Sequence, residues 1–296
     1  MSETKLVTAF YTDIIGFPFF GHETTARHER YLHSLKTIAN TKNEIVLYCN
    51  ESQKNILTDF CNEHSLNNVQ IKVSNLSDLP QSQKMKDIKT KTDMFNFYHE
   101  VDWNKFYLLE KEYDESYDYI YWIDCGLSHP GLFLDRYNPY IEKADGLSRT
   151  YENYSYINLF NENLIEKLNN WVGDKIINCC ITMISHDMGY AASILDREYT
   201  VSNSSVGGIL GGKIKHLTWY INKFKELSEL SLSKDSILNH EAILTFIQNE
   251  NSEKFKTWEF DTWYHDDYWT KTPHFDVSSI KNMRHFVHLF DKVLEI

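Results

Sequence analysis

Residues 117 to 130, Tyr-Asp-Tyr-Ile-Tyr-Trp-Ile-Asp-Cys-Gly-Leu-Ser-His-Pro, decide the fold of this chain. The aromatic and β-branched run from Tyr119 to Ile123 predicts a buried strand. An acidic residue, Asp124, follows where the chain has to turn. Because ligands of open α/β sheets bind outside the carboxyl ends of the strands, this carboxylate is a candidate binding residue. The structural alternative is a turn or a helix cap, which strand-terminal aspartates also form.

Strands and helices alternate on the amino-terminal side of this stretch. Apolar runs predict three strands, at residues 5–11, 45–48 and 69–73. Apolar side chains at helical spacing predict two helices between them, with these residues facing inward: Tyr31, Leu35 and Ile38 in the first, and Ile56, Leu57, Phe60 and Cys61 in the second. This order predicts a parallel or mixed sheet with helices on its faces.

The segment before the decisive strand is polar and then helical. Residues 75 to 93 are Lys-rich without an apolar period, which predicts a surface loop, with a lid over a bound anion as the functional alternative. A helix is predicted over 94–113. Beyond Asp124 the pattern predicts further elements at these positions: a helix near 164–171, an apolar run at 176–184, a helix with Leu217, Ile221, Phe224 and Leu227 inward, a helix near 236–248 and a strand at 255–260.

Composition limits the class of protein. The chain has 296 residues, of which 42% are hydrophobic and 15% aromatic, so a substantial core is available. The net charge of −12 argues against a broad nucleic-acid surface, which needs a basic face. Five cysteines without zinc spacing predict reduced thiols of a cytosolic protein. No apolar run approaches the roughly 20 residues of a membrane span, and no targeting segment is expected before the first strand.

Two glycine pairs follow in the second half of the chain. Gly207-Gly208 and Gly211-Gly212 let a ligand approach the backbone without obstruction from a Cβ atom. The spacing matches neither a Walker loop nor the dinucleotide fingerprint, because Ile214 stands where a Walker loop has a hydroxyl residue. A tight turn or a bulge is the alternative explanation.

Acidic and histidine residues complete the candidates. Glu241 lies early in a predicted helix, where it serves as a general base, as an acceptor for a sugar hydroxyl, or simply as a partner of the helix dipole. The run Trp263-Tyr-His-Asp-Asp267 combines rings that stack on sugars with groups that bind metals. The carboxylate of Asp124 is a hard oxygen donor suited to Mg²⁺ or Mn²⁺.

Together these motifs resemble the bacterial HtrL/YibB family, which includes WlaTC-type proteins and is regarded as glycosyltransferase-like with a GT-A fold. The resemblance spans about residues 5 to 270 and is carried by the following stretches: Val7-Thr-Ala-Phe10, Asn104-Lys105, Trp122-Ile-Asp-Cys-Gly126, Val206-Gly-Gly-Ile-Leu-Gly-Gly-Lys213, Asn239-His-Glu241 and Trp263-Tyr-His-Asp-Asp267. It implies a single GT-A-like domain over 1–296, with a mixed, mostly parallel sheet flanked by helices. The nucleotide-binding half is about 1–124 and the acceptor-side half about 125–296.

The resemblance also implies roles for single residues. The residues that would contact the nucleotide or line the donor site are Thr8, Ala9, Phe10, Tyr11, Lys105, Asp124, Cys125, Gly126, Gly207, Gly208, Gly211 and Gly212. Asp124 takes the place of the first aspartate of the Asp-x-Asp motif, and His265 that of a late metal-binding histidine. Glu241 and Asp266 are the catalytic candidates. Because Gly126 stands where the motif has its second aspartate, cations such as Lys213 or Lys105 are an alternative to the metal.

The implied function is transfer of a sugar from a nucleoside-diphosphate sugar, with a UDP-sugar favoured, to a saccharide or lipid-linked acceptor. This fits bacterial surface polysaccharide synthesis in the cytoplasm, with peripheral association at the inner face of the membrane as an open point. Mn²⁺ or Mg²⁺ would be the cofactor, and no nucleic-acid partner is expected. The alternatives are a sugar nucleotidyltransferase and a non-catalytic carbohydrate-binding protein of the same fold. The residues at 12–21 count against the first, because they are neither Gly-rich nor basic.

Overall fold

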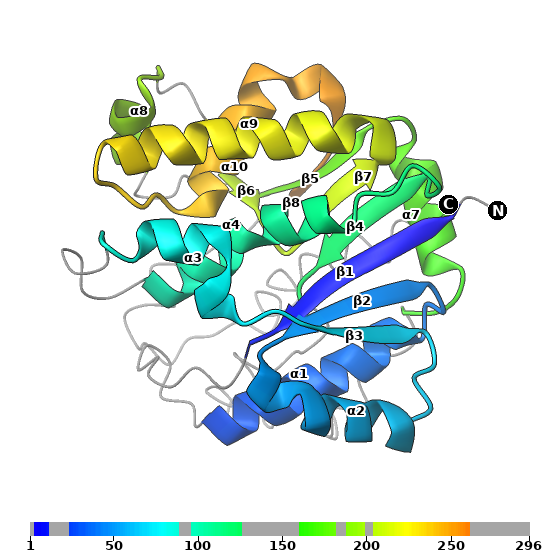
Figure 1. Cartoon of the computed structure of the whole chain (residues 1–296). Coiled ribbons are helices and arrows are strands. Elements are labelled where there is room, and N and C mark those ends of the chain that lie inside the picture. The colour runs from blue at the N-terminus through cyan, green and yellow to red at the C-terminus, as the bar shows by residue number, and fades with distance from the viewer. Residues whose placement is uncertain are drawn as a thin grey trace, which may run out of the picture.

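A computed structural model describes residues 3–11, 24–88, 96–125, 160–181, 188–198 and 204–260. Its centre is one sheet of eight strands, shown in Figure 1, in the order β3-β2-β1-β4-β7-β5-β6, with β8 paired to β5. The strands are β1 (Thr4–Phe10), β2 (Glu44–Cys49), β3 (Val69–Val73), β4 (Tyr119–Ile123), β5 (Ile176–Ile181), β6 (Ser204–Val206), β7 (Ile209–Lys213) and β8 (Phe255–Phe260).

The sheet is parallel in its first half and mixed in its second. Strands β3, β2, β1 and β4 run parallel to one another. Strand β7 is antiparallel to β4 and β5, β6 is antiparallel to β5, and β8 is parallel to β5. The predicted α/β class, a mixed and mostly parallel sheet flanked by helices, is confirmed.

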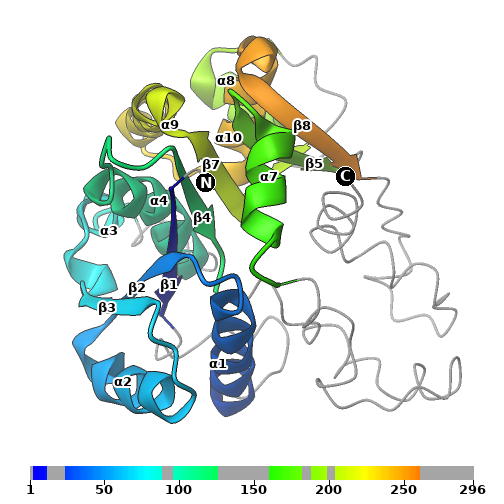
Figure 2. The ribbon, with the colours of Figure 1, turned by 90° about the vertical axis from the view of Figure 1, so that its right-hand side faces the viewer.

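Helices cover both faces of the sheet. The α-helices are α1 (Thr24–Ala39), α2 (Lys54–Glu63), α3 (Pro80–Met85), α4 (Asn96–Lys111), α7 (Leu164–Val172), α8 (Met188–Leu195), α9 (Ile214–Ser233) and α10 (His240–Glu250). Short 3-10 turns lie at η2 (Glu51–Gln53), η3 (Leu76–Asp78) and η6 (Ser252–Lys254). Figure 2 shows α4 and α9 on one side of the sheet and α1 and α7 on the other.

Alternating side chains along β4 pack into two separate cores. On β4, Ile120 and Trp122 pack into the core beneath α4 and α9, whereas Tyr121 and Ile123 pack into the core beneath α7. All four are at most 1% exposed. This strand is therefore buried on both faces, as its continuous apolar run predicts.

Most predicted elements are confirmed, and two details are wrong. Ile56 was expected to face inward but is 50% exposed on α2, whereas Leu57 and Cys61 of the same helix are buried. The segment predicted as a loop over residues 75–93 contains η3 and α3 in its described part. Met85 anchors α3 in the core beneath α4, so tertiary packing orders a segment that lacks a helical apolar period.

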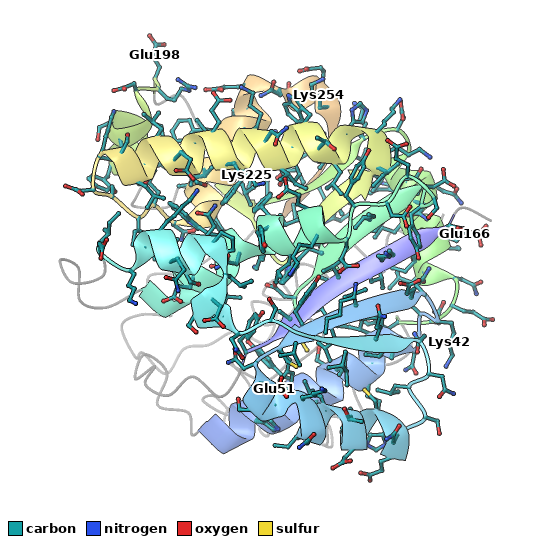
Figure 3. The ribbon with its side chains drawn as sticks, viewed as in Figure 1. Lys42, Glu51, Glu166, Glu198, Lys225 and Lys254 are labelled. Carbon is teal, nitrogen blue, oxygen red and sulfur yellow. The ribbon has the colours of Figure 1, made fainter. Side chains whose placement is uncertain are left out.

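Charged side chains project from the outer surfaces of the helices, as Figure 3 shows for Lys225 and Lys254. The ammonium of Lys225 on α9 pairs with the carboxylate of Glu110 on α4, which joins the two helices at the surface. None of the five cysteines, all of which lie within the described residues and are buried, forms a disulfide. Among the described helices, none combines the length and apolar character that a membrane crossing requires.

Candidate active site

The turn at Gly207 and Gly208 links β6 to β7 and lies beside the carboxyl end of β4. The antiparallel register pairs Ile123 with Ile209. The next pair along this register is Asp124 and Gly208. The backbone N–H of Asp124 donates to the carbonyl of Gly208 at 2.9 Å. The register of two strands therefore places the predicted carboxylate against the predicted glycine pair.

One oxygen of the Asp124 carboxylate is held by two donors. The indole Nε1 of Trp122 donates to Oδ1 at 2.6 Å, and the ammonium of Lys105 lies 2.9 Å from the same oxygen. Trp122 and Asp124 are two residues apart at a strand end and therefore point to the same face. The Asp124 side chain is 37% exposed, and within the described residues Oδ2 takes part in no hydrogen bond or ion pair. The carboxylate is therefore fixed through Oδ1 and partly exposed.

The ammonium of Lys105 on α4 has three oxygen partners. These are Asp102 Oδ1 at 2.8 Å, Asp124 Oδ1 at 2.9 Å and the Gly207 carbonyl at 3.1 Å. A lysine ammonium carries three N–H donors, so this group is saturated. Burial lowers the pKa of Lys105, but the two carboxylates outweigh it and raise the pKa above its ordinary value. The side chain is 4% exposed and acts as a permanent internal cation.

Asp102 connects this cation to helix α10. Its Oδ2 lies 3.0 Å from Nδ1 of His240, the first residue of α10, while its Oδ1 contacts Lys105. Burial raises the pKa of Asp102, but His240 and Lys105 overcome this effect and hold the pKa well below its usual range. The imidazole packs directly under Gly207, where a Cβ atom would lie 1.9 Å from Nε2. Gly207 thus needs to be glycine because of His240.

Glu241 lies on the other side of the same turn, in the first turn of α10 as predicted. Its Oε1 accepts the backbone N–H of Gly207 at 3.2 Å. The N-cap residue Asn239 accepts the backbone N–H of Glu241 at 2.8 Å and fixes the start of the helix. Burial raises the pKa of Glu241 above its ordinary value. A carboxyl group of this kind is suited to taking or giving a proton.

The structure brings together five of the residues expected at the site: Lys105, Asp124, Gly207, Gly208 and Glu241. It adds Asp102 and His240, which sequence reasoning missed. A signal was available for Asp102, because it lies three residues before Lys105 on one predicted helix, the spacing of an ion pair. No comparable signal links Asp102 to His240, since their contact depends on the docking of α4 and α10.

The second glycine pair lies inside the sheet. A Cβ atom on Gly211 would lie 2.2 Å from the carbonyl oxygen of Ile120, and one on Gly212 would lie 2.4 Å from that of Lys175. Both residues also have positive φ, 108° and 143°. Close approach of the neighbouring backbone accounts for both glycines, so their position gives no support to the predicted role in lining the donor site.

Residues at the end of β1 are committed to packing. Phe10 is 0% and Tyr11 6% exposed, and the Tyr11 hydroxyl donates to the Ser74 carbonyl at 2.8 Å. Thr8 and Ala9 are also buried. The Cys125 thiol is buried, and desolvation raises its pKa far above the ordinary value. The negative charge of the neighbouring Asp124 raises the pKa in addition. A thiol with a raised pKa is a poor nucleophile, and a nucleotide-lining role of these residues stays a prediction.

Two expectations about lysines are corrected. Lys213 does not serve as a cation near Asp124, because the register pairs it with Tyr119 at the opposite end of β4. Its ammonium instead pairs with Asp118 at 2.8 Å. Lys105 does reach Asp124, and this contact is what the predicted alternative to a metal ion requires. The ammonium has no N–H left for a nucleotide base or ribose, however, because its three donors are taken.

Gly126, His265 and Asp266 lie outside the described residues. Within the described ranges no group of three His, Cys, Asp or Glu side chains is placed to hold a metal ion. Asp124 offers such an ion one oxygen, and its other oxygen already faces an ammonium. The described residues by themselves therefore do not fit a divalent metal.

Comparison with known proteins gives a fold-level likeness. No family model matches the chain, and no curated protein matches it. Among solved structures, mouse xyloside xylosyltransferase 1 in its apo form is similar with a TM-score of 0.44 and 9% identity, covering 90% of this chain and 91% of that one. The 4-diphosphocytidyl-2C-methyl-D-erythritol synthase of Anaerococcus prevotii has a TM-score of 0.39 and 10% identity, covering 97% and 96%.

Proposed function

We propose that this chain is a glycosyltransferase that moves a sugar from a nucleoside-diphosphate sugar, with a UDP-sugar favoured, to a saccharide or lipid-linked acceptor. The observation that carries the proposal is the Asp124 carboxylate, which lies at the carboxyl end of β4 with Oδ1 held by two donors and its side chain 37% exposed. Ligands of such sheets bind at this edge. The resemblance to the HtrL/YibB family supports the same function, together with a cytoplasmic location and a role in surface polysaccharide synthesis.

Asp124 and Glu241 both contact the Gly207–Gly208 turn, and they have different roles in the proposed reaction. The Asp124 carboxylate is oriented by Lys105 and Trp122, so its other oxygen is an acceptor for a hydroxyl of the donor. Glu241 contacts the other side of the turn through the Gly207 N–H. Its raised pKa suits it to accept the proton of the attacking hydroxyl as the new glycosidic bond forms.

Mn²⁺ or Mg²⁺ stays a prediction that depends on His265. When bound, such an ion would neutralise the charge that develops on the diphosphate leaving group. No step of the proposed mechanism is assigned to it, because the described residues supply one carboxylate oxygen only.

Titration calorimetry tests the donor site directly. UDP, GDP and CDP are each titrated into the protein, once with Mn²⁺ and once with EDTA. We expect UDP to bind with the highest affinity, and absence of binding by all three at millimolar concentration would refute the donor site. Release of sugar from a UDP-sugar, even by slow hydrolysis, separates an enzyme from a carbohydrate-binding protein without activity.

A further inference from the structure

We propose that Asp102 is a positioning residue of the donor site: it holds the Lys105 ammonium against Asp124 and thereby orients the Asp124 carboxylate. The inference rests on the proposed function and adds a residue to it. Asp102 acts through Lys105, whereas Asp124 is the residue that contacts the donor.

Each oxygen of Asp102 has its own partner. Oδ1 lies 2.8 Å from the Lys105 ammonium on the same helix, and Oδ2 lies 3.0 Å from Nδ1 of His240 on α10. Its side chain is 17% exposed, less than half the 37% of Asp124. Asp102 therefore joins two helices behind the carboxylate that faces the ligand.

The ammonium needs Asp102 in order to stay in place. A lysine head group sits on a flexible four-carbon stem, and its direction is set by its acceptors. Two of the three acceptors of Lys105, Asp124 and the Gly207 carbonyl, belong to the site itself. Asp102 is the acceptor on the helix that carries the lysine, three residues away, so it fixes the ammonium independently of the ligand-facing strand end.

Because the Lys105 ammonium is saturated, removal of Asp102 affects ligand binding only indirectly. Lys105 has no spare donor for a phosphate, so removal of Asp102 deletes no contact to the ligand. It frees one N–H and leaves a buried cation with one counter-ion fewer, which loosens the position of Asp124 Oδ1. A change in nucleotide affinity after Asp102→Asn therefore passes either through Lys105 or through His240, the other partner of Asp102.

A double-mutant cycle tests this dependence. UDP affinity is measured by calorimetry for the full-length wild-type chain, for Asp102→Asn, for Lys105→Met and for the double variant. We expect Asp102→Asn to weaken binding about tenfold in the wild-type background and less than about twofold in the Lys105→Met background, since residues of one network are not additive. Equal weakening in both backgrounds, or none in the first, overturns the proposal. Lys105→Gln replaces Lys105→Met if the latter does not fold.

Nuclear magnetic resonance gives a second measurement that does not depend on UDP. Ammonium protons held by three acceptors exchange slowly with water, so ¹⁵N-labelled lysine should give a protected Lys105 signal in the wild type. The signal is expected to disappear in Asp102→Ala, which removes the acceptor, and to persist in Glu110→Ala, a matched control that removes a surface carboxylate from the same helix. A protected signal in Asp102→Ala overturns the positioning role.

The two proposals fail in different ways. If wild-type protein binds none of the nucleotides, the proposed function fails and the positioning role fails with it. If the wild type binds UDP and Asp102→Asn binds it equally well, only the positioning role is lost.

Discussion

Lys105 and Asp124 join helix α4 to the carboxyl end of strand β4, with the ammonium 2.9 Å from Oδ1. This contact means that the carboxylate expected to bind a ligand already has a cation of its own. The cation in turn is shared with Asp102 and the Gly207 carbonyl. The charges of this cluster are therefore paired within the protein, before any ligand is bound.

Replacement of Asp124 tests the residue at the centre of the site. Asp124→Ala should abolish turnover and weaken UDP binding by about 1.5–3 kcal/mol, which is typical of a lost hydrogen bond to a charged group. Folding should be retained, because Asp102 still balances Lys105. Activity assays and calorimetry measure the effect, and thermal unfolding checks the fold. Asp118→Ala is the matched control, since Asp118 precedes the other end of β4 and pairs with Lys213 at the surface. A fully active Asp124→Ala would contradict the assigned role.

Glu241 should determine the acid side of the pH profile. A general base works as the carboxylate, so kcat/KM should fall as the pH decreases through the pKa of Glu241. Because burial raises that pKa, the fall should lie above the ordinary glutamate value of about 4.3. Glu241→Gln should lower kcat by roughly 10²- to 10⁴-fold and remove this limb. Glu250→Gln, at the exposed end of the same helix, should leave the profile unchanged. An unaltered profile in Glu241→Gln would exclude it as the base.

Gly207 should tolerate no side chain, whereas Gly189 should tolerate one. A Cβ atom on Gly207 would collide with the His240 imidazole, so Gly207→Ala should cost about 1–3 kcal/mol and displace the turn. A Cβ atom on Gly189 would meet no other atom within 4 Å, and this residue lies in helix α8, so Gly189→Ala should be neutral or stabilising. Urea unfolding compares the two. If His240 is the cause, Gly207→Ala should cost less in a His240→Ala background than in the wild type.

Glu112 should contribute to stability in a pH-dependent way. The carboxylate is 3% exposed, accepts the Tyr48 hydroxyl and lies 2.7 Å from the Lys72 ammonium. Burial raises the pKa of Glu112. The hydrogen bonds from Lys72 and Tyr48 lower it by more than burial raises it, so the net pKa is below the ordinary value. A lowered pKa in the folded state stabilises the protein above the unfolded-state pKa, and this stability is lost as the pH falls through the folded-state pKa.

Glu112→Gln should therefore destabilise the protein by about 3 kcal/mol at pH 7, the cost of breaking a buried pair. The difference from the wild type should shrink below about pH 4, near the ordinary pKa of glutamate. Denaturant unfolding at a series of pH values measures this trend. The surface variant Glu110→Gln should show a small difference at every pH. A constant deficit for Glu112→Gln between pH 7 and pH 3 would contradict the linkage.

The sequence predicted the parts of the site that depend on local pattern. Asp124 was found because an apolar run defines where its strand ends, and Glu241 because a helix period defines where its helix begins. Lys213 was misplaced because it follows the glycine pairs in sequence, whereas the antiparallel register carries it to the other end of β4. The contact of Asp102 with His240 depends on helices α4 and α10 docking against each other, and local pattern does not encode such docking.

The glycine pairs also separate what local pattern predicts from what tertiary contacts determine. All four glycines of the two pairs look alike in sequence, yet Gly207 makes room for an imidazole while Gly211 and Gly212 make room for backbone carbonyls. Which neighbour requires the missing Cβ is decided by strand pairing, not by the glycine itself. The helix α3 was missed for a related reason, since Met85 is fixed by the distant core.

The Gly207–Gly208 turn also imposes an order on the maturation of the site. Asp102, Lys105 and Asp124 leave the ribosome long before the turn and α10 are made. Until then the ammonium lacks its third oxygen partner and Asp102 lacks its imidazole. A nascent chain that has completed the parallel half of the sheet should therefore not yet bind nucleotide, and competence should arise when α10 packs behind the turn.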